Sequence, residues 1–551
     1  MKLAAKSLAL LFTLAATLAH TQTLPHFQHI IILFQENRTP DNLFGGNPTF
    51  EPGVDLQQSQ LGQPWCLGAC FDPNHSHPSF ESIWNPGSGQ APMCNGGKSS
   101  CTNTVVSCPL TGPLYSTCNG QLITQTPNNA QETYVSPTYD NNVMLPYFEV
   151  AQNYGFANYM FQTNEGPSNL AHQFIFSGTS AVTGDPTQQY YQDFAAENPA
   201  DSKNTGCAGD PNNTIFQINS NGQESNQQGG PPKITPPCFE HPTLASLLDS
   251  NKVSWRYYAD RHDPAGNSIW TAPNSIQDIC APISKGSGQC NGPEWVDNVE
   301  LNSQKILSDL EPPVNGNPGC DLRAVSWVIP WGDRSDHPGM QEGQASTDIE
   351  HGPAWVSAVI NEVGTTTCTD TINGKQVPYW QDTAIFVTWD DWGGFWDHIN
   401  PDSSAGGPGV LYNATGHPCS GFGCGYIYGF RVPLLVVSAY TPAGYVSGDT
   451  RTHGETFPYI HDFGSILAFI ENNFLGSGAI GQINPQYKFA DAFAPDGVRD
   501  NIPLADFFTL TMPRQFQSIV LPSAWQGYDA NYFLNYSGPI MDPDNDAIDN
   551  D

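Results

Sequence analysis

Two apolar runs that end in acidic or amide residues decide the fold: residues 29–45 read HIIILFQENRTPDNLFG, and residues 382–401 read DTAIFVTWDDWGGFWDHINP. Each run begins with a short segment rich in Ile, Val and Phe, which is typical of a buried strand in a parallel sheet. Residues 324–330 and 432–440 have the same character, and residues 155–161 are a fifth candidate. We therefore predict a mainly parallel sheet built from these segments.

Amphipathic segments lie between the predicted strands. Apolar residues recur at helical spacing in residues 353–363, 465–474 and 244–251, and Ser465 is a capping-type residue at the start of its segment. A further helix is expected over residues 168–177. Strands that alternate with helices predict an α/β fold.

Long loops interrupt this alternation. The 551 residues include 52 Gly and 47 Pro, and only 13% are charged. Residues 86–133 and 199–237 are rich in Gly, Pro and Asn, and we interpret them as insertions because the alternating pattern resumes after each. The sequence predicts one domain over residues 24–511, followed by a weakly patterned tail, residues 512–551, whose acidic end is expected to be a solvated, mobile terminus.

The chain is strongly acidic, with a net charge of −34 from 19 Lys and Arg against 53 Asp and Glu. This balance argues against nucleic-acid binding and disfavours peripheral binding to anionic lipid. Solubility is the simpler reading of the charge.

The first nineteen residues have the features of a signal peptide. Lys2 and Lys6 precede an apolar stretch that is too short to span a membrane, and Ala19 is a plausible cleavage site. Fourteen cysteines, an even number, fit an exported chain with disulfides. Six of them lie between Cys66 and Cys118, where loop stapling is favoured over zinc binding. The sequence predicts a secreted protein, extracellular or periplasmic, without stable membrane insertion.

Polar residues follow the predicted strands. In chain order these are Glu36 and Asn37, Ser168, then Asp333, Asp336 and His337, and finally Asp390 and Asp391. Ligands of open α/β sheets bind at the carboxyl ends of the strands, so these side chains are expected to meet at one edge.

Asp390 and Asp391 are the sharpest single feature. Adjacent acids at the end of a buried strand repel each other, unless a divalent cation lies between them and Glu36. The alternative is that they cap a turn before Gly393 and Gly394. With Glu36 and Asn37 at a second strand end, metal binding is the better hypothesis. Oxygen ligands favour Ca²⁺, Mg²⁺ or Mn²⁺ over Zn²⁺.

Ser168 follows Gly166 and Pro167 at the start of a predicted helix. It could be an ordinary helix N-cap. The same position would also present N–H groups to a phosphate, and a nearby metal would make the hydroxyl a nucleophile.

The two opening motifs resemble those of the phosphoesterase family that contains phosphatidylcholine-cleaving phospholipases C and an acid phosphatase branch. Residues 72–85 (DPNHSHPSFESIWN), VSWRYYAD, AVSWVIP with a later DHP, GFRVPLLVVSAY and SILAFIENNF are similar in order and spacing. The resemblance runs from about residue 29 to residue 508 and implies an alkaline-phosphatase-like, three-layer α/β/α sandwich.

The resemblance also implies a site: a divalent metal held by Glu36, Asn37, Ser168, Asp390 and Asp391. Ser168 would be the nucleophile and form a phosphoenzyme. His75 and His337 would contact phosphate or protonate the leaving alcohol, and neutral or mildly acidic pH suits histidine for this. His351 is a further candidate. His77 is a rival to His75, and His398 could simply orient the turn at Asp397.

Three departures from the family pattern affect the expected substrate. Thr39-Pro40 replaces the usual Ser-Phe, Asp391-Trp392 replaces Glu-His, and Ser168 stands where Thr is frequent. The expected substrate is therefore left as a small phosphoester or a phospholipid, with Trp392, Phe395 and Trp396 able to form either an apolar mouth or part of the core. The alternative function is a non-catalytic, secreted, cation-binding or interaction protein that retains the fold.

Overall fold

We describe the protein from a computed structural model. The description covers residues 24–537 except for these segments: 69–70, 78, 81–104, 107–115, 120, 124–128, 184, 186, 188–192, 220–222, 261–264, 314–317, 339–350, 400, 402–427, 453–458, 486–488 and 498–501. The predicted signal peptide, most of the first insertion and the acidic end of the tail lie outside the described residues.

The central sheet has eight strands in the order β13-β12-β14-β1-β17-β18-β8-β19. Strands β1 (His29–Gln35) and β17 (Thr383–Trp389) lie at its centre, and all seven residues of each pair in parallel. Both strands are fully buried, as their apolar runs predict. Parallel pairing continues outward from β1 through β14 (Val325–Val328), β12 (Trp255–Tyr258) and β13 (Val299–Glu300).

The predicted parallel direction is wrong for one segment. Strand β18 (Leu434–Ser438) runs antiparallel to both β17 and β8 (Gly155–Ala157). An apolar run shows that a strand is buried, but it does not show the strand's direction. The candidate strand at 155–161 also divides: β8 joins the main sheet, whereas β9 (Met160–Phe161) pairs with β20 (His461–Asp462). Strand β19 (Tyr445–Ser447) pairs in parallel with β8 at the sheet edge.

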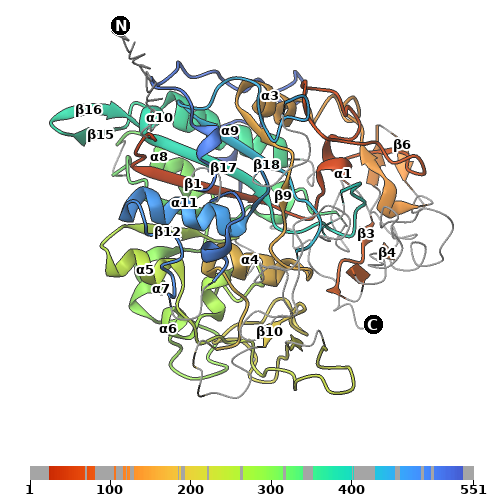
Figure 1. Ribbon diagram of the computed structural model, residues 1–551, viewed down its shortest axis with the longest axis vertical. Helices are drawn as coiled ribbons and strands as arrows, with labels where there is room; N and C mark the ends of the chain where they lie inside the picture. Colours follow the sequence, from red (N-terminus) through yellow and green to blue (C-terminus); the bar gives the residue numbers. More distant parts are fainter. Residues whose placement is uncertain are drawn as a thin grey trace, which may run out of the picture.

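Helices cover both faces of the sheet, so the predicted three-layer α/β/α arrangement is confirmed (Figure 1). One layer contains α3 (Leu145–Asn153) and α9 (Gly352–Thr365), and the other contains α4 (Ser168–Ser177), α5 (Leu244–Ser250) and α11 (Phe463–Leu475). The alternation of β17 side chains shows the two faces. Phe386 contacts Phe469 of α11, whereas Trp389 contacts Tyr147 of α3.

The helices α4, α5, α9 and α11 form close to the predicted residues. The start of α11 differs, because Asp462 is the N-cap and its side chain accepts from the backbone N–H of Ser465 at 2.8 Å. Ser465 lies inside the first turn and completes a reciprocal capping box. The remaining helices are short: α1 (Pro40–Phe44), α6 (Gln277–Cys280), α7 (Pro293–Asn298), α8 (Lys305–Leu310), α10 (Tyr379–Asp382) and α13 (Ala530–Asn535).

Short two-stranded sheets form within the loops outside the central sheet. They are β2 (Pro64–Trp65) with β7 (Tyr134–Val135), β3 (Asp72–Pro73) with β4 (Val105–Val106), β5 (Ser116–Cys118) with β6 (Gln121–Ile123), β10 (Phe194–Ala195) with β11 (Gln217–Ile218), and β15 (Thr369–Ile372) with β16 (Lys375–Pro378). The described part of the second insertion is folded against the body rather than loose. For example, the backbone N–H of Ala196 donates to the carbonyl oxygen of Phe216, and that of Cys207 donates to the carbonyl oxygen of Asn274.

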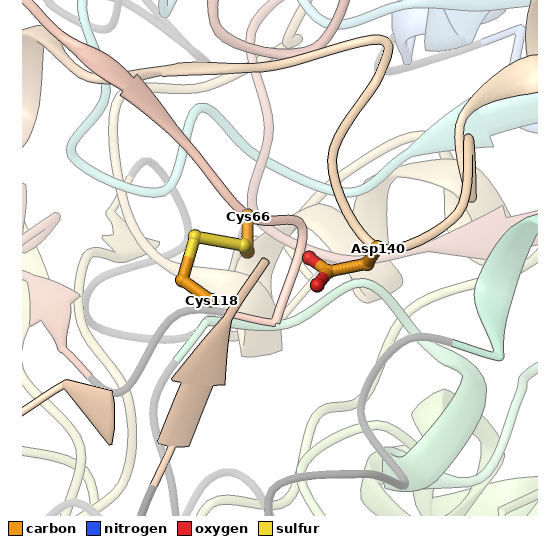
Figure 2. Close-up of side chains that lie close together, drawn as sticks. All are labelled: Cys66, Cys118 and Asp140. Carbon is orange, nitrogen blue, oxygen red and sulfur yellow. A yellow bond between two sulfur atoms is a disulfide. The ribbon is translucent and has the colours of Figure 1, made fainter. Parts of the chain in front are cut away.

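Disulfides staple the loops, as predicted. The described bonds are Cys66–Cys118, Cys207–Cys238, Cys280–Cys290 and Cys320–Cys368. Figure 2 shows Cys66 bonded to Cys118, with the carboxylate of Asp140 nearby. That carboxylate accepts from the backbone N–H of Asn119. Because both sulfur atoms are used in the disulfide, this group offers no thiolate to a metal.

The tail packs further along the chain than its weak pattern suggests. Ile519 and Phe533 are buried, and α13 contacts α8 and α9. Part of the described tail therefore packs against the body, and the domain boundary at residue 511 stays a prediction. No described helix combines the length and apolar composition needed to cross a membrane.

Candidate active site

The carboxyl ends of β1 and β17 bring the predicted acidic and amide residues together. Gln35 pairs with Trp389, so Glu36–Asn37 and Asp390–Asp391 leave the sheet side by side. The backbone N–H of Asn37 donates to Oδ1 of Asp390 at 2.8 Å. All four side chains are fully buried. The rule that ligands bind at the carboxyl ends of parallel strands thus accounts for the position of these four residues.

The turn after Asp391 is shaped by glycine. Gly393 and Gly394 have φ of 60° and 69°, a backbone conformation that residues with a Cβ rarely adopt. A Cβ on Gly393 would collide with the carbonyl oxygen of Asn37. The backbone N–H of Gly393 donates to Oδ1 of Asp391 at 2.7 Å. The glycine pair therefore lets the acidic turn lie directly against Asn37.

Ser168 points into the same cluster. It is the first residue of α4, and Pro167 occupies the N-cap, so the interpretation of Ser168 as an ordinary N-cap is wrong. Its Oγ lies 3.1 Å from Oδ2 of Asp391 and 3.4 Å from Oδ1 of Asn37. The hydroxyl thus stands at a helix N-terminus and faces the carboxylates of the other strand ends.

Two histidines complete the opposite side of Asn37. Nδ2 of Asn37 lies 3.2 Å from Nε2 of His75 and 3.0 Å from Nε2 of His337. The Nδ1 atoms face the carbonyl oxygens of Pro73 and Pro338 and are placed to donate to them. In the neutral rings, these bonds leave Nε2 as the acceptor that faces the site.

His172 belongs to the cluster, although the sequence reasoning missed it. Its Nε2 lies 3.2 Å from Oε1 of Glu36 and 3.9 Å from Oδ2 of Asp390. Its ring stacks on Phe34 of β1, and burial lowers the pKa of His172 to about 4. His172 follows Ser168 by four residues, which places both on one face of α4. That spacing was the available signal.

The charges of the cluster fit a divalent cation. Glu36, Asp390 and Asp391 are all fully buried, and His172 is neutral over the ordinary pH range. Burial, and then the charge of Asp390, raise the pKa of Asp391 to about 8. Ligand atoms of Glu36, His172 and Asp390 lie within 4.8 Å of one another. A cation held among them would offset the cost of burying several carboxylates.

His77 is engaged elsewhere. Its ring nitrogens lie 2.8 Å from Oε2 of Glu165 and 2.6 Å from Oε1 of Glu224. Although burial alone lowers the pKa of His77, the two carboxylates raise it well above its ordinary value. A ring that donates from both nitrogens is protonated. Of the two neighbours, His75 faces Asn37, whereas His77 bridges two acids.

The structure does not bring His351 to this cluster. His351 precedes α9, its Nδ1 lies 3.8 Å from Oδ2 of Asp333, and its ring packs against Tyr528 of the tail. Asp333 in turn pairs with Arg334 at 2.9 Å. The sequence placed His351 among the candidates by resemblance alone, and its surroundings are those of a packed helix start.

The aromatic residues beside the acidic pair are core rather than an open mouth. Trp392 and Phe395 are fully buried, and Trp396 is 9% exposed. Trp392 packs against Phe80 and Phe430, and the Arg38 guanidinium lies over the ring of Phe395. These contacts stabilise the strand-end loops and leave the rings little surface for a lipid chain.

His398 lies in a polar network with Asp41, Asp55 and Asp397. Its Nδ1 lies 2.5 Å from Oδ2 of Asp41, and its Nε2 lies 3.2 Å from Oδ1 of Asp55. Although burial lowers the pKa of His398, the carboxylates raise it from 6.5 to about 9. The protonated ring is thus paired with two acids.

This pairing predicts a pH dependence of stability. A raised pKa stabilises the folded state fully below pH 6.5, and the stabilisation is lost as pH rises through about 9. The rise in the pKa of His398 corresponds to roughly 3 kcal/mol of stabilisation. We expect the free energy of unfolding of the wild type to fall from pH 6 to pH 9 more than that of His398→Asn, measured by chemical denaturation. The exposed His26→Asn is the control, and parallel curves for wild type and His398→Asn would contradict the prediction.

Curated relatives of this chain are phospholipases C. Phospholipase C A of Mycobacterium tuberculosis is 25% identical over 305 residues, covering 53% of this chain and 52% of its own. The non-hemolytic phospholipase C of Burkholderia pseudomallei is 28% identical over 256 residues, covering 42% of this chain and 32% of its own. Non-specific phospholipase C6 of Arabidopsis thaliana is 31% identical over 108 residues, 18% of each chain. The chain thus spans about half the length of the Mycobacterium relative, and less of the others.

Solved structures resemble it more distantly. A protein in the alkaline phosphatase superfamily from Vibrio parahaemolyticus has a TM-score of 0.29 at 11% identity, covering 66% of this chain and 65% of its own. Ps i-CgsB in complex with k-i-k-neocarrahexaose has a TM-score of 0.31 at 8% identity, covering 87% and 78%. At such scores, the fold assignment rests on the sheet and helices described above. The model of the Phosphoesterase family matches residues 27–475, and on this match the chain belongs to the Phosphoesterase family.

Proposed function

We propose that this protein hydrolyses phosphoric esters with Ser168 as the nucleophile. The observation that carries the proposal is the position of Oγ, which stands at the first residue of α4 and 3.1 Å from Oδ2 of Asp391. A purely structural cation site has no need of a hydroxyl there. Family membership and the phospholipase C relatives support the reaction class.

Glu36, Asn37, Asp390, Asp391 and Ser168 would hold a divalent metal ion, with His172 beside them. Such an ion supplies positive charge that lowers the pKa of the Ser168 hydroxyl and neutralises the phosphate. Carboxylate and amide oxygens favour Mg²⁺, Ca²⁺ or Mn²⁺, and the imidazole of His172 extends the choice to Zn²⁺. The site residues thus fit a metal-dependent phosphoesterase.

The chain's own groups account for the remaining steps. Oγ of Ser168, after losing its proton, attacks phosphorus as the bond to the leaving alcohol breaks, which leaves a phosphoryl group on Ser168 from a phosphomonoester or a phosphocholine group from phosphatidylcholine. His75 and His337 face the site through Nε2 and, when protonated, donate a proton to the leaving oxygen. A water molecule, which gives a proton to the now neutral histidine, then attacks the phosphorus, and this releases phosphate or phosphocholine and frees Oγ of Ser168 for the next cycle. The N–H groups at the start of α4 hold the phosphoryl oxygens.

The substrate is a small phosphomonoester or a phospholipid, and the buried positions of Trp392 and Phe395 favour the small one. We also propose that the protein is secreted. The signal-like residues 1–19 and the disulfides support export.

The direct test is to trap the covalent intermediate. Wild-type protein would be mixed with a small aryl phosphomonoester or with phosphatidylcholine, quenched in acid and analysed by peptide mass spectrometry. We expect a phosphoryl group on Ser168 with the phosphomonoester or a phosphocholine group with phosphatidylcholine, and no label on protein that was treated with chelator before the substrate was added. Ser177→Ala, at the other end of α4, is the matched control and should still be labelled. If the protein turned over neither substrate, the non-catalytic, cation-binding alternative would be favoured.

His172 gives a separate prediction. His172→Phe keeps the stack on Phe34 but removes the nitrogen beside Glu36 and Asp390. We expect the metal concentration needed for half-maximal activity to rise by about 10- to 100-fold, as for other groups that orient or hold a metal. His241→Phe is the control, because burial also lowers the pKa of His241 to about 4 but His241 lies outside the cluster. An unchanged metal requirement would remove His172 from the site.

A further inference from the structure

A second cluster of ligand-type side chains lies at the opposite end of β1 from the active site. His29 opens β1, Asp382 ends α10 immediately before β17, and Asp370 lies on the β15–β16 hairpin. Ligand atoms of these three residues all lie within 4.8 Å of one another. In Figure 1 the hairpin and α1 stand at opposite ends of β1. At about 3.3 Å per residue, this strand separates the two clusters by roughly 20 Å.

The orientation of His29 is fixed in the way typical of a metal ligand. Its Nδ1 lies 2.9 Å from the backbone carbonyl oxygen of Arg323 and donates to it. In the neutral ring this leaves the lone pair of Nε2 facing Oδ2 of Asp370 at 2.7 Å. Two acceptors at that distance need a proton or a cation between them. A carbonyl that binds the other ring nitrogen is a recurrent partner of metal-bound histidine.

The environment of Asp382 favours a bound metal ion over a simple ion pair between His29 and Asp370. A protonated His29 would satisfy Asp370, but it would leave Asp382 uncompensated. Asp382 is 3% exposed and receives no N–H or O–H donor from the described residues, and the carboxyl group of Asp370 beside it can meet it only through a shared proton or a cation. Burying a carboxylate without donors is costly, so this side chain points to a ligand that is shared with its neighbours.

The polar network around His398 shows the contrast. Asp41, Asp397 and His398 also lie within 4.8 Å of one another. There, the buried Arg431 bonds both oxygens of Asp397 and lies 3.4 Å from Asp41. That cluster already contains a cation, whereas the ion pairs of the described residues place no arginine or lysine on Asp382.

We propose that His29, Asp370 and Asp382 bind a divalent transition-metal ion such as Zn²⁺. One imidazole and two carboxylates are three protein ligands of the kind such ions accept, with water completing the shell. The Asp370 side chain is 30% exposed and gives the ion a route from solvent. The Cys320–Cys368 disulfide links the segments that carry Arg323 and Asp370, so two partners of His29 are held in place before the ion binds.

The ion has a structural role at this position. It joins the first residue of β1, the residue before β17 and the projecting hairpin, and so fixes the amino end of the two central strands. Stabilisation by a ligand grows with its concentration above the dissociation constant, so added Zn²⁺ raises the melting temperature. Turnover does not depend directly on this ion, because the catalytic groups lie at the other end of β1.

The test compares the wild type with Asp382→Asn and, as an independent variant, His29→Gln. Full-length proteins are stripped with chelator, equilibrated with ZnCl₂, desalted and analysed by plasma mass spectrometry. We expect each variant to hold one zinc ion fewer per chain than the wild type and to keep wild-type turnover. The gain in melting temperature on adding ZnCl₂ should shrink in both. Asp321→Asn, whose carboxylate lies nearby but is 38% exposed, is the control and should bind as the wild type does.

Equal zinc content in wild type and both variants would overturn the proposal. A metal-free Asp382→Asn that is more stable than the wild type, with unchanged zinc content, would show instead that Asp370 and Asp382 share a proton. Because the readout is the difference between wild type and variant, it holds whether or not the active site also binds zinc.

Discussion

Replacing Ser168 with alanine is expected to lower turnover of the preferred phosphoester by at least about 10⁴-fold, the scale of loss when a catalytic nucleophile is removed. The hydroxyl is the group that faces both Asp391 and Asn37, and alanine leaves nothing there to form a covalent intermediate. Initial rates at saturating substrate would measure the change, with melting temperatures confirming that the fold is intact.

Two companion variants sharpen this result. Ser168→Thr keeps a hydroxyl at the start of α4 and should retain measurable turnover. Ser177→Ala removes a buried hydroxyl from the last residue of the same helix and should leave turnover near that of the wild type. If Ser168→Ala were as active as the wild type, Ser168 would not be the nucleophile.

Replacing Arg431 with methionine is expected to lower the free energy of unfolding by about 3–5 kcal/mol, because it leaves buried carboxylates without their cation. The Arg431 guanidinium is fully buried and bonds Asp397 at 2.9 and 3.0 Å. It also donates to the carbonyl oxygens of Asp55 and Asn158. Methionine fills similar volume but satisfies none of these acceptors.

Denaturant titration would measure this loss, with Arg451→Met as the control. The side chain of Arg451 pairs with Asp449 on the surface and is 60% exposed, so its removal should change the free energy of unfolding little. Adding Asp397→Leu to Arg431→Met should recover part of the loss, because it removes the unpaired acid. A small effect of Arg431→Met would mean that water or rearrangement compensates for the missing charge.

The parts of the site that follow strand ends could be predicted from the sequence. Apolar runs located β1 and β17, and the edge rule for parallel strands placed Glu36, Asn37, Asp390 and Asp391 together. The helix that begins at Ser168 was also predictable, because Gly166 and Pro167 break the chain just before an apolar segment. In each case, local composition and one rule of sheet geometry were enough.

Other features depend on contacts that local sequence does not encode. The antiparallel direction of β18 is set by its pairing with β17 and β8, and its apolar run is compatible with either direction. His172 reaches Glu36 only because α4 packs against β1, and His351 lies beneath aromatic residues that come from the tail. The sequence alone did not distinguish His77 from His75. The difference comes from Glu224 of the second insertion, which hydrogen-bonds His77.

The cluster around Asn37 also has a consequence for the way the protein matures. Its members come from five stretches of chain, contributing Asn37, His75, Ser168, His337 and Asp391. Contacts between residues so far apart in sequence form slowly. The entropy of closing the long loops is lost before the contacts contribute any favourable free energy. During refolding, helical circular dichroism should therefore return before turnover does. Enzymatic activity would then report the completion of folding more strictly than any spectroscopic measure of secondary structure.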